Sequence, residues 1–262
     1  ANQHTLTFFS EKSFWATALT IAIIAAAGYW INDVYDFRID RINKPKRTIV
    51  NAILSVKKVL TAYFLTNMAI LLFSVSYLGF FSKFYQITFI NFLSVIMLFI
   101  YASYLKRVSV AGNLVVSFLT TLVVILAGYL YQVNLPLIWA GIFAFEITFI
   151  REITKDIEDI KGDLSFNLHT LPIQIGIQRT KYILLALYIL FILSSYLPFA
   201  IHAWRTDQFL WTYLILSILL VQLPMLWLVR KMWQANEPAD FSRQSQGLKF
   251  LILAGMLTLF FL

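Results

Sequence analysis

The stretch WATALTIAIIAAAGYWINDVYDFRID, residues 15–40, joins an apolar run to a row of oxygen-bearing side chains. Its first half carries no charged residue. Asn32, Asp36 and Asp40 recur every fourth position, so at the helical repeat they fall on one face. Amide and carboxylate oxygens are ligands that hard divalent cations such as Mg²⁺ prefer. The stretch therefore predicts a membrane-spanning helix that ends in a cation site.

A second cluster, KDIEDIKGD at residues 155–163, has the same character. Asp156, Asp159 and Asp163 are spaced three and four residues apart, which predicts one stripe along a helix. Of the 13 acidic residues, eight lie within 32–40 or 151–163. Carboxylates concentrated in this way repel one another unless a cation lies between them. The two clusters therefore indicate a metal-dependent function.

The composition places the rest of the chain in a membrane. Hydrophobic residues make up 60% and charged residues only 13%, with a mean hydropathy of +0.76, whereas soluble domains are roughly 25% charged. The apolar runs have the length of a helix that crosses a bilayer and lack the alternation of a barrel strand. We expect an all-α, polytopic membrane helical bundle without a separate soluble domain. Its eight predicted spans are 13–33, 56–78, 86–105, 111–131, 135–153, 180–202, 208–233 and 242–262.

The basic residues predict the orientation. Alternate connections, at 34–58, 104–110, 151–181 and 230–249, hold 18 of the 21 lysines and arginines. Because such residues favour the cytoplasmic side, both aspartate clusters are expected to face the cytoplasm from the cell (inner) membrane. Residues before Phe14 do not have the layout of a cleaved export signal. The chain has no cysteine, which excludes disulfides and thiolate metal sites.

The net charge of +8 is explained by topology and anionic lipid headgroups, so no nucleic-acid partner is expected. Basic residues also lie near both clusters, which suits a polyanion such as a diphosphate. Mg²⁺ held by carboxylates keeps open positions for phosphate oxygens and makes a diphosphate a good leaving group. Loss of an allylic diphosphate leaves a carbocation, which a dry pocket rich in aromatic rings can protect. Aromatic residues form 17% of the chain.

Two motifs resemble those of a known family. Asn-Asp-x-x-Asp-x-x-x-Asp at 32–40, continued by RINKPKR at 41–47, resembles the first motif of the UbiA superfamily of intramembrane prenyltransferases. The 155–163 cluster, followed by Thr-Leu-Pro-Ile at 170–173 and by Gly176, is similar to the second. Within the superfamily, residues 151–159 are most similar to geranylgeranylglycerol-phosphate geranylgeranyltransferases. Chlorophyll synthases share much of both motifs.

The resemblance implies nine transmembrane helices around a central cavity that opens to the cytoplasmic side, with the motifs on helices two and six. Here the motifs fall on predicted spans one and five of eight. We therefore expect a single domain over residues 1–262 that lacks the first helix of the family. The loop at 48–51, Thr-Ile-Val-Asn, also departs from the Pro-Ile-Pro-Ser-Gly of many relatives.

The resemblance also implies the residues of the site. Two Mg²⁺ ions are expected, one held by Asn32, Asp36 and Asp40, with Asp33 as an additional ligand, and the other by Asp156, Asp159 and Asp163. Asp36, Asp40, Asp156 and Asp159 are the expected catalytic residues. The substrate phosphates are expected to contact Lys46, Arg47, Tyr104, Lys106, Arg107, Arg151 and Lys155.

The implied activity is Mg²⁺-dependent transfer of a prenyl group. An allylic prenyl diphosphate, expected to be geranylgeranyl diphosphate, would be ionised, and a lipid acceptor, expected to be geranylgeranylglycerol phosphate, would capture the prenyl group. An aromatic acceptor, such as a quinone precursor or a chlorophyllide, stays open. No feature of the sequence indicates the oligomeric state.

Two other functions can be weighed on the residues. A CDP-alcohol phosphotransferase also uses clustered aspartates, but its motif begins Asp-Gly and contains an Ala-Arg pair, and neither is present here. A cation transporter would place ionisable groups near the middle of the bilayer rather than at its boundary. Three single residues keep two interpretations each: Glu146 as a functional group or a structural hydrogen-bonding group, His169 as a base or a structural residue, and Asn113 as a helix cap or a cavity-lining amide.

Overall fold

The computed structural model describes residues 12–43, 45, 48–130 and 135–262, with side chains left out at 127–130 and 135. Over these residues the secondary structure is helical, and two isolated β-bridges are the extent of the β-structure. The all-α prediction is therefore confirmed for this part of the chain. The chain forms two compact units, Ala1–Lys106 and Arg107–Leu262.

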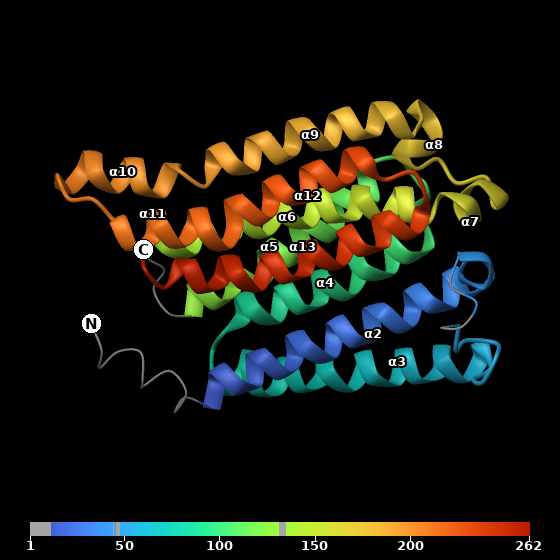
Figure 1. Ribbon diagram of the computed structural model, residues 1–262. Coiled ribbons are helices and arrows are strands. Elements are labelled where there is room, and N and C mark those ends of the chain that lie inside the picture. Colours follow the sequence, from blue (N-terminus) through green and yellow to red (C-terminus); the bar gives the residue numbers. More distant parts are fainter. Residues whose placement is uncertain (1–11, 44, 46–47, 131–134) are drawn as a thin grey trace. The chain divides into compact units, whose positions relative to one another are not determined.

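The first unit is built on α2 (Lys12–Asn43), which carries the first aspartate cluster (Figure 1). It packs against α3 (Val56–Phe73) and α4 (Tyr85–Ser103), and α3 continues into the π-helical segment η1 (Ser74–Phe81). With 32 residues, α2 is about 48 Å long, well beyond the roughly 30 Å of a hydrocarbon core. Its polar C-terminal end, where the cluster lies, can therefore project past the apolar layer.

Small apolar clusters hold the first unit together. Ala27, Ile31 and Tyr63 pack between α2 and α3. Deeper along the helices, the amide of Asn91 donates to the hydroxyls of Thr20 (3.1 Å) and Ser74 (3.0 Å). Hydrogen bonds between helices stabilise packing in a medium where apolar contacts alone give little preference.

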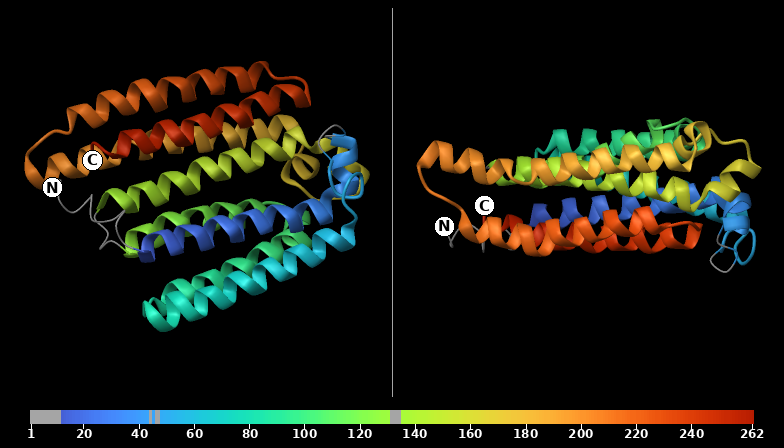
Figure 2. Two further views of the ribbon diagram at one scale, coloured as in Figure 1. Left: turned by 90° about the horizontal axis from the view of Figure 1, so that it is seen from below. Right: turned by 45° about the horizontal axis from the view of Figure 1, so that its top comes forward.

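The second unit is arranged around α6 (Leu135–Glu158), which packs against α5 (Ala111–Leu130), α9 (Ile177–Ser194) and α13 (Pro238–Leu259). Within this unit the long helices run side by side in every view (Figures 1 and 2). The remaining elements are α7 (Ile160–Ser165), α8 (Leu171–Ile175), α10 (Leu197–Thr206), α11 (Trp211–Ser217), the π-helical η3 (Ile218–Gln222) and α12 (Leu223–Gln234).

A continuous core joins these helices. Ile150, Leu184, Met225 and Leu248 are at most 1% exposed and come from α6, α9, α12 and α13. Proline marks several helix starts, including Pro198 in the first turn of α10, because its missing N–H costs nothing there. The core places α7, α8 and the α12–α13 connection at the same end of the unit as the second aspartate cluster (Figure 1).

Five helical stretches among the described residues are long and apolar enough to cross a membrane. They are Lys12–Asn43, Val56–Phe81, Tyr85–Ser103, Ile177–Thr206 and Trp211–Gln234. These correspond to five of the eight predicted spans. Most of the described residues in the predicted spans 111–131, 135–153 and 242–262 also lie on helices, namely α5, α6 and α13, but these helices are not among the five. The number of eight spans and the central cavity stay predictions.

Candidate active site

The first oxygen-rich stripe lies on a single helix, as predicted. Asn32, Asp36 and Asp40 all belong to α2, and Asp36 is 4% exposed. The Asn32 amide donates to Asp36 Oδ2 at 2.7 Å. Asp40 is half-buried and Asp33 is exposed. The four-residue repeat of the sequence thus brings the amide and the central carboxylate together one turn apart.

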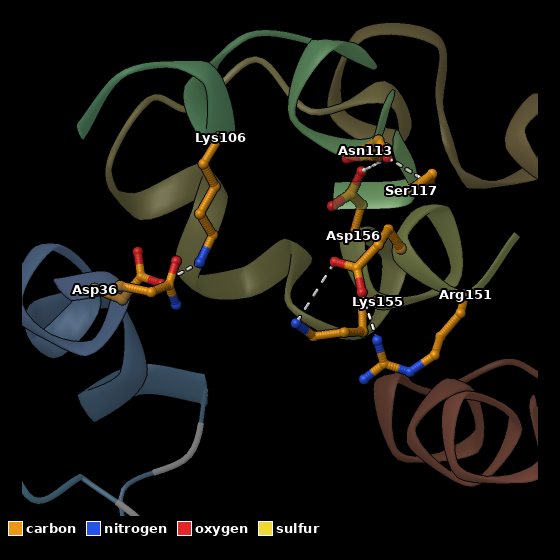
Figure 3. A network of polar contacts seen from close by, with 9 residues as sticks. Asp36, Lys106, Asn113, Ser117, Arg151, Lys155 and Asp156 are labelled. Carbon is orange, nitrogen blue, oxygen red and sulfur yellow. Dashed lines mark hydrogen bonds and ion pairs between the residues drawn. The ribbon is translucent and has the colours of Figure 1, made fainter. Parts of the chain in front are cut away.

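Lys106 comes to this stripe from the far end of α4. It lies in the short 3-10 turn η2 (Leu105–Arg107), and its ammonium group donates to Asp36 Oδ2 and forms an ion pair with it (Figure 3). Asp33 interacts electrostatically with both Asp36 and Lys106. The first unit therefore places a predicted phosphate-binding lysine directly beside a predicted metal ligand.

The second oxygen-rich stripe is not one continuous helix, so this expectation was wrong in part. α6 ends at Glu158 and α7 begins at Ile160, with Asp159 between them at φ −91° and ψ 3°. Aspartate disfavours a helix interior, which agrees with the break at Asp159. Backbone hydrogen bonds from Asp159 to Lys155 (2.8 Å) and from Asp163 to Asp159 (3.1 Å) still carry the helical spacing across it.

Asp156 has a partner that the sequence left open. It lies beyond the apolar part of α6, and its Oδ2 accepts a hydrogen bond from the Asn113 amide at 2.8 Å (Figure 3). Asn113 is buried at the start of α5, where Ser117 donates to its backbone carbonyl at 2.7 Å. Asn113 therefore contacts a motif carboxylate, and its two predicted roles, helix cap and cavity-lining amide, stay predictions. The feature of the sequence that pointed to Asn113 was an amide in the otherwise apolar first turn of this helix.

Burial raises the pKa of Asp156 to about 7, although the hydrogen bond from Asn113 favours the charged form. The neighbouring carboxylates Glu152 and Asp163 raise the pKa further, and Lys155 lowers it. A cation that approaches would stabilise the charged form of this buried carboxylate and offset the repulsion from its two acidic neighbours. This part of the second unit is therefore suited to a positively charged ligand.

Basic side chains surround Glu152, which is 7% exposed. Arg151 Nη1 forms an ion pair with Glu152, and Lys155 Nζ lies 3.9 Å from Glu152 Oε2 (Figure 3). Lys249 on α13 belongs to the same group, because its charge interacts with those of Arg151, Lys155 and Glu152. Lys249 was not assigned to the site from the sequence. The signal available in the sequence was its position as one of two basic residues, with Arg243, inside the last predicted span.

The remaining predicted residues are less closely tied to these clusters. Lys46 and Arg47 lie outside the described residues. Tyr104 follows the end of α4 and is 64% exposed. Arg107 is exposed, and its carbonyl accepts the backbone N–H of His169 at 3.2 Å. Glu146 accepts a hydrogen bond from Ser194 at 2.7 Å, which favours its structural interpretation.

The motif residues fit a magnesium ion by their donor chemistry. Across the described residues, no group of three or more histidine, cysteine or acidic side chains is arranged to hold a metal. Mg²⁺, however, is usually held by one or two carboxylates and completes its shell with water and substrate phosphates. Asn32 Oδ1 is buried and accepts no hydrogen bond from the described part of the chain. It is an oxygen that a cation could use.

Comparisons with known proteins agree with the motifs. The model of the UbiA prenyltransferase family matches residues 4–254. The digeranylgeranylglyceryl phosphate synthase of Saccharolobus solfataricus is 36% identical over 197 residues, which cover 74% of this chain and 68% of that protein. The protein of the same name from Methanosphaera stadtmanae is 40% identical over 163 residues, covering 62% of this chain and 57% of that protein.

A solved structure, described as "Structural and mechanistic insights into the biosynthesis of Digeranylgeranylglyceryl phosphate synthase in membranes", has the same fold. The TM-score is 0.67 at 23% identity, over 95% of this chain and 86% of that one. With the apolar helices, these likenesses identify an integral membrane protein. The chain belongs to the UbiA prenyltransferase family.

Proposed function

We propose that this protein transfers a prenyl group from an allylic prenyl diphosphate to the hydroxyl group of a prenylated glycerol phosphate, with Mg²⁺ as the cofactor. The observation that carries the proposal is the pairing of a carboxylate cluster with basic side chains in each unit. Lys106 meets Asp36 in the first unit, and Lys155 and Arg151 meet Glu152 beside Asp156 in the second. A metal-bound diphosphate and the phosphate of the acceptor together need both kinds of group.

The carboxylates of the two motifs would bind the metal. Asp36, with Asn32 beside it, offers oxygen ligands in the first unit, and Asp156 with Asp163 offers them in the second. Bound Mg²⁺ would supply positive charge to the phosphate oxygens and stabilise the leaving group. Lys106 is placed to move between the carboxylate of Asp36 and a phosphate oxygen, since a lysine ammonium can turn its three donors on a flexible stem.

The chemistry requires one bond to break and one to form. The bond between C1 of the prenyl chain and the diphosphate oxygen breaks, and its electron pair leaves with the diphosphate. The acceptor hydroxyl oxygen then bonds to C1 of the allylic cation and releases its proton. The products are an ether, inorganic diphosphate and one proton. Lysine and arginine side chains near the diphosphate stabilise the charge that develops on it.

The proposed acceptor rests on the name of the relatives and on the basic side chains of the second unit. The relatives' name refers to a lipid that carries a glyceryl phosphate. Arg151, Lys155 and Lys249 form a basic group in the second unit that suits a second phosphate, separate from the donor's leaving group. We further propose that the protein lies in the cell membrane with both motifs facing the cytoplasm.

The test is product formation by the purified protein in nanodiscs, with geranylgeranyl diphosphate and geranylgeranylglycerol phosphate as substrates. Ether lipid and diphosphate should appear in equal amounts, and EDTA should abolish both. Asp36→Asn and Asp159→Asn should each lower turnover by about 100-fold or more, since each removes charge that would hold the metal. Asp207→Asn, the same change at an exposed carboxylate outside both motifs, should leave turnover unchanged.

Full activity of Asp36→Asn in EDTA would refute the metal mechanism. Turnover with 4-hydroxybenzoate as acceptor, but not with the glycerol phosphate, would refute the proposed acceptor while leaving prenyl transfer intact. Equal loss of activity in Asp207→Asn would show that the losses reflect folding.

A further inference from the structure

The turn that joins α2 to α3, residues 48–55, exposes large apolar side chains just beyond the first aspartate cluster. Ile53 is 78% exposed, Ile49 52% and Leu54 45%. Single exposed apolar residues are common on proteins. Three of them within six positions of one short turn give it an exposed apolar tip that water solvates poorly.

This turn has a defined structure. Val50 is 4% exposed and packs with Val34 and Val59, which anchors the turn to both helices. The Ile49 carbonyl accepts backbone hydrogen bonds at 2.9–3.2 Å from the next residues of the turn, which are Ala52, Ile53 and Leu54. Because Val50 points into this core, the turn holds Ile53 outward.

A hydrogen bond from α2 secures the turn further. Arg41 Nη2 donates to the Asn51 carbonyl at 3.0 Å, and Asn51 adopts φ 58°. The guanidinium groups of Arg38 and Arg41 lie 5.5 and 5.9 Å from the ring centre of Phe37. The exposed apolar tip is thus held by the basic end of α2.

The sequence on both sides of the tip, residues 41–58, is basic. Residues 41–58 contain six lysines and arginines and no acidic residue, and no acidic residue occurs between Asp40 and Glu146. Among the described residues, Arg41, Lys57 and Lys58 are exposed. A small apolar tip with a basic border suits the boundary between anionic headgroups and acyl chains. An apolar tip of this kind is less favourable when water is its only surrounding.

The start of α3 indicates that the tip lies near the level of the lipid headgroups. α3 begins at Val56, and the candidate span Val56–Phe81 begins there too. Lys57 and Lys58 at its start mark the headgroup level, since such side chains extend toward phosphate groups. Ile53 precedes them by only one helical turn in sequence.

We propose that the 48–55 turn inserts Ile49, Ile53 and Leu54 into the interfacial layer of an anionic lipid leaflet, with the exposed Lys57 and Lys58 on the lipid phosphates. None of these three apolar side chains belongs to the proposed catalytic site. It would hold the Asp36 end of α2 at the level where lipid phosphates lie.

Spin labelling tests the proposal directly, because the chain has no cysteine of its own. Ile53→Cys carries a nitroxide label in liposomes of phosphatidylcholine with 30% phosphatidylglycerol, and relaxation by oxygen and by Ni-EDDA gives its depth. Phe64→Cys on the exposed face of α3 is the lipid reference, and Asn236→Cys in the exposed α12–α13 connection is the water reference. We expect the label at position 53 to lie at intermediate depth, with at least a threefold lower Ni-EDDA accessibility than at position 236.

Changing the lipid tests the charge. In pure phosphatidylcholine the label should move toward water, and Lys57→Gln with Lys58→Gln should produce the same shift in anionic liposomes. Ni-EDDA accessibility equal to that at position 236 would overturn the proposal. Low accessibility to both reagents would overturn it too, because protein would then cover the tip. Equal depth in both lipids would refute the anionic partner. None of these readouts depends on catalysis.

Discussion

The side-chain amide of Asn113 donates a hydrogen bond to Asp156, whose charged form is disfavoured by burial. Its amide lies 2.8 Å from Asp156 Oδ2, and both groups belong to the second unit. Losing a hydrogen bond to a buried charged group costs roughly 1.5–3 kcal/mol. An amide in the first turn of an apolar helix therefore has a specific role, which its neighbours in the sequence do not reveal.

Asn113→Leu keeps the size of the side chain and removes the donor. We expect a lower apparent melting temperature, measured by tryptophan fluorescence in detergent, and at least a tenfold loss of turnover because Asp156 is no longer oriented. The control is Ser117→Ala, one turn further along α5, whose hydroxyl donates only to the carbonyl of Asn113. Equal effects of the two substitutions would contradict a specific role for the amide.

The start of α13 shows how a helix end is stabilised at the scale of an element. Glu237 and Asp240 form a capping box, and the backbone N–H groups of Asn236 and Glu237 each lie 3.2 Å from Asp240 Oδ2. Lys181 on α9 donates to the Ala235 carbonyl at 2.7 Å. The α12–α13 connection is thus held from its own helix and from a neighbouring one.

The capping box predicts a pH dependence. Hydrogen bonds from the backbone of Asn236 and Glu237 hold the pKa of Asp240 below its usual value near 3.8. The stabilisation is therefore fully present above the unfolded pKa and is lost as pH falls through the lower folded value. Asp240→Asn should lower the apparent melting temperature at pH 7, and the difference from the parent should shrink below about pH 4.

A control variant and the pH dependence together test the role of the Asp240 carboxylate. Asp207→Asn, at the C-terminal end of α10, should not change the melting temperature at pH 7 because it removes no N-terminal cap. A difference between Asp240→Asn and the parent that stays constant from pH 7 to pH 3 would show that the carboxylate charge does not act at the cap.

At the scale of the whole molecule, the basic residues predict the orientation in the membrane. Asn236 and Gln208 flank the candidate span Trp211–Gln234, so they lie on opposite sides of a bilayer if this helix crosses it. The connection at 230–249 is rich in basic residues, and Arg205 is the basic residue near the other end. Asn236 should therefore face the cytoplasm.

A membrane-impermeant maleimide tests the orientation, since each variant would carry a single cysteine. In intact cells, Gln208→Cys should react within minutes, whereas Asn236→Cys should react only after permeabilisation. Both should react equally in detergent. The reverse pattern would invert the topology and place the connection that follows α12 outside.

Several features of the fold could be predicted from local sequence. The oxygen-rich stripe on α2 follows from the four-residue spacing of Asn32, Asp36 and Asp40. The second stripe was predicted in its residues but not in its continuity, because the spacing of Asp156, Asp159 and Asp163 is the same whether or not the helix breaks at Asp159. Lys249 was missed because its closeness to Arg151 comes from the packing of α13 on α6.

The sequence by itself determined the membrane setting and the two acidic motifs, because hydropathy and helical spacing act over neighbouring residues. Tertiary structure decided the partners of those motifs. Lys106 pairs with Asp36 across 70 positions, and Asn113 bonds to Asp156 across 43. Packing also turned Val50 inward and Ile53 outward in one short turn. Such contacts join groups far apart in the chain, and no local pattern encodes which distant groups will meet.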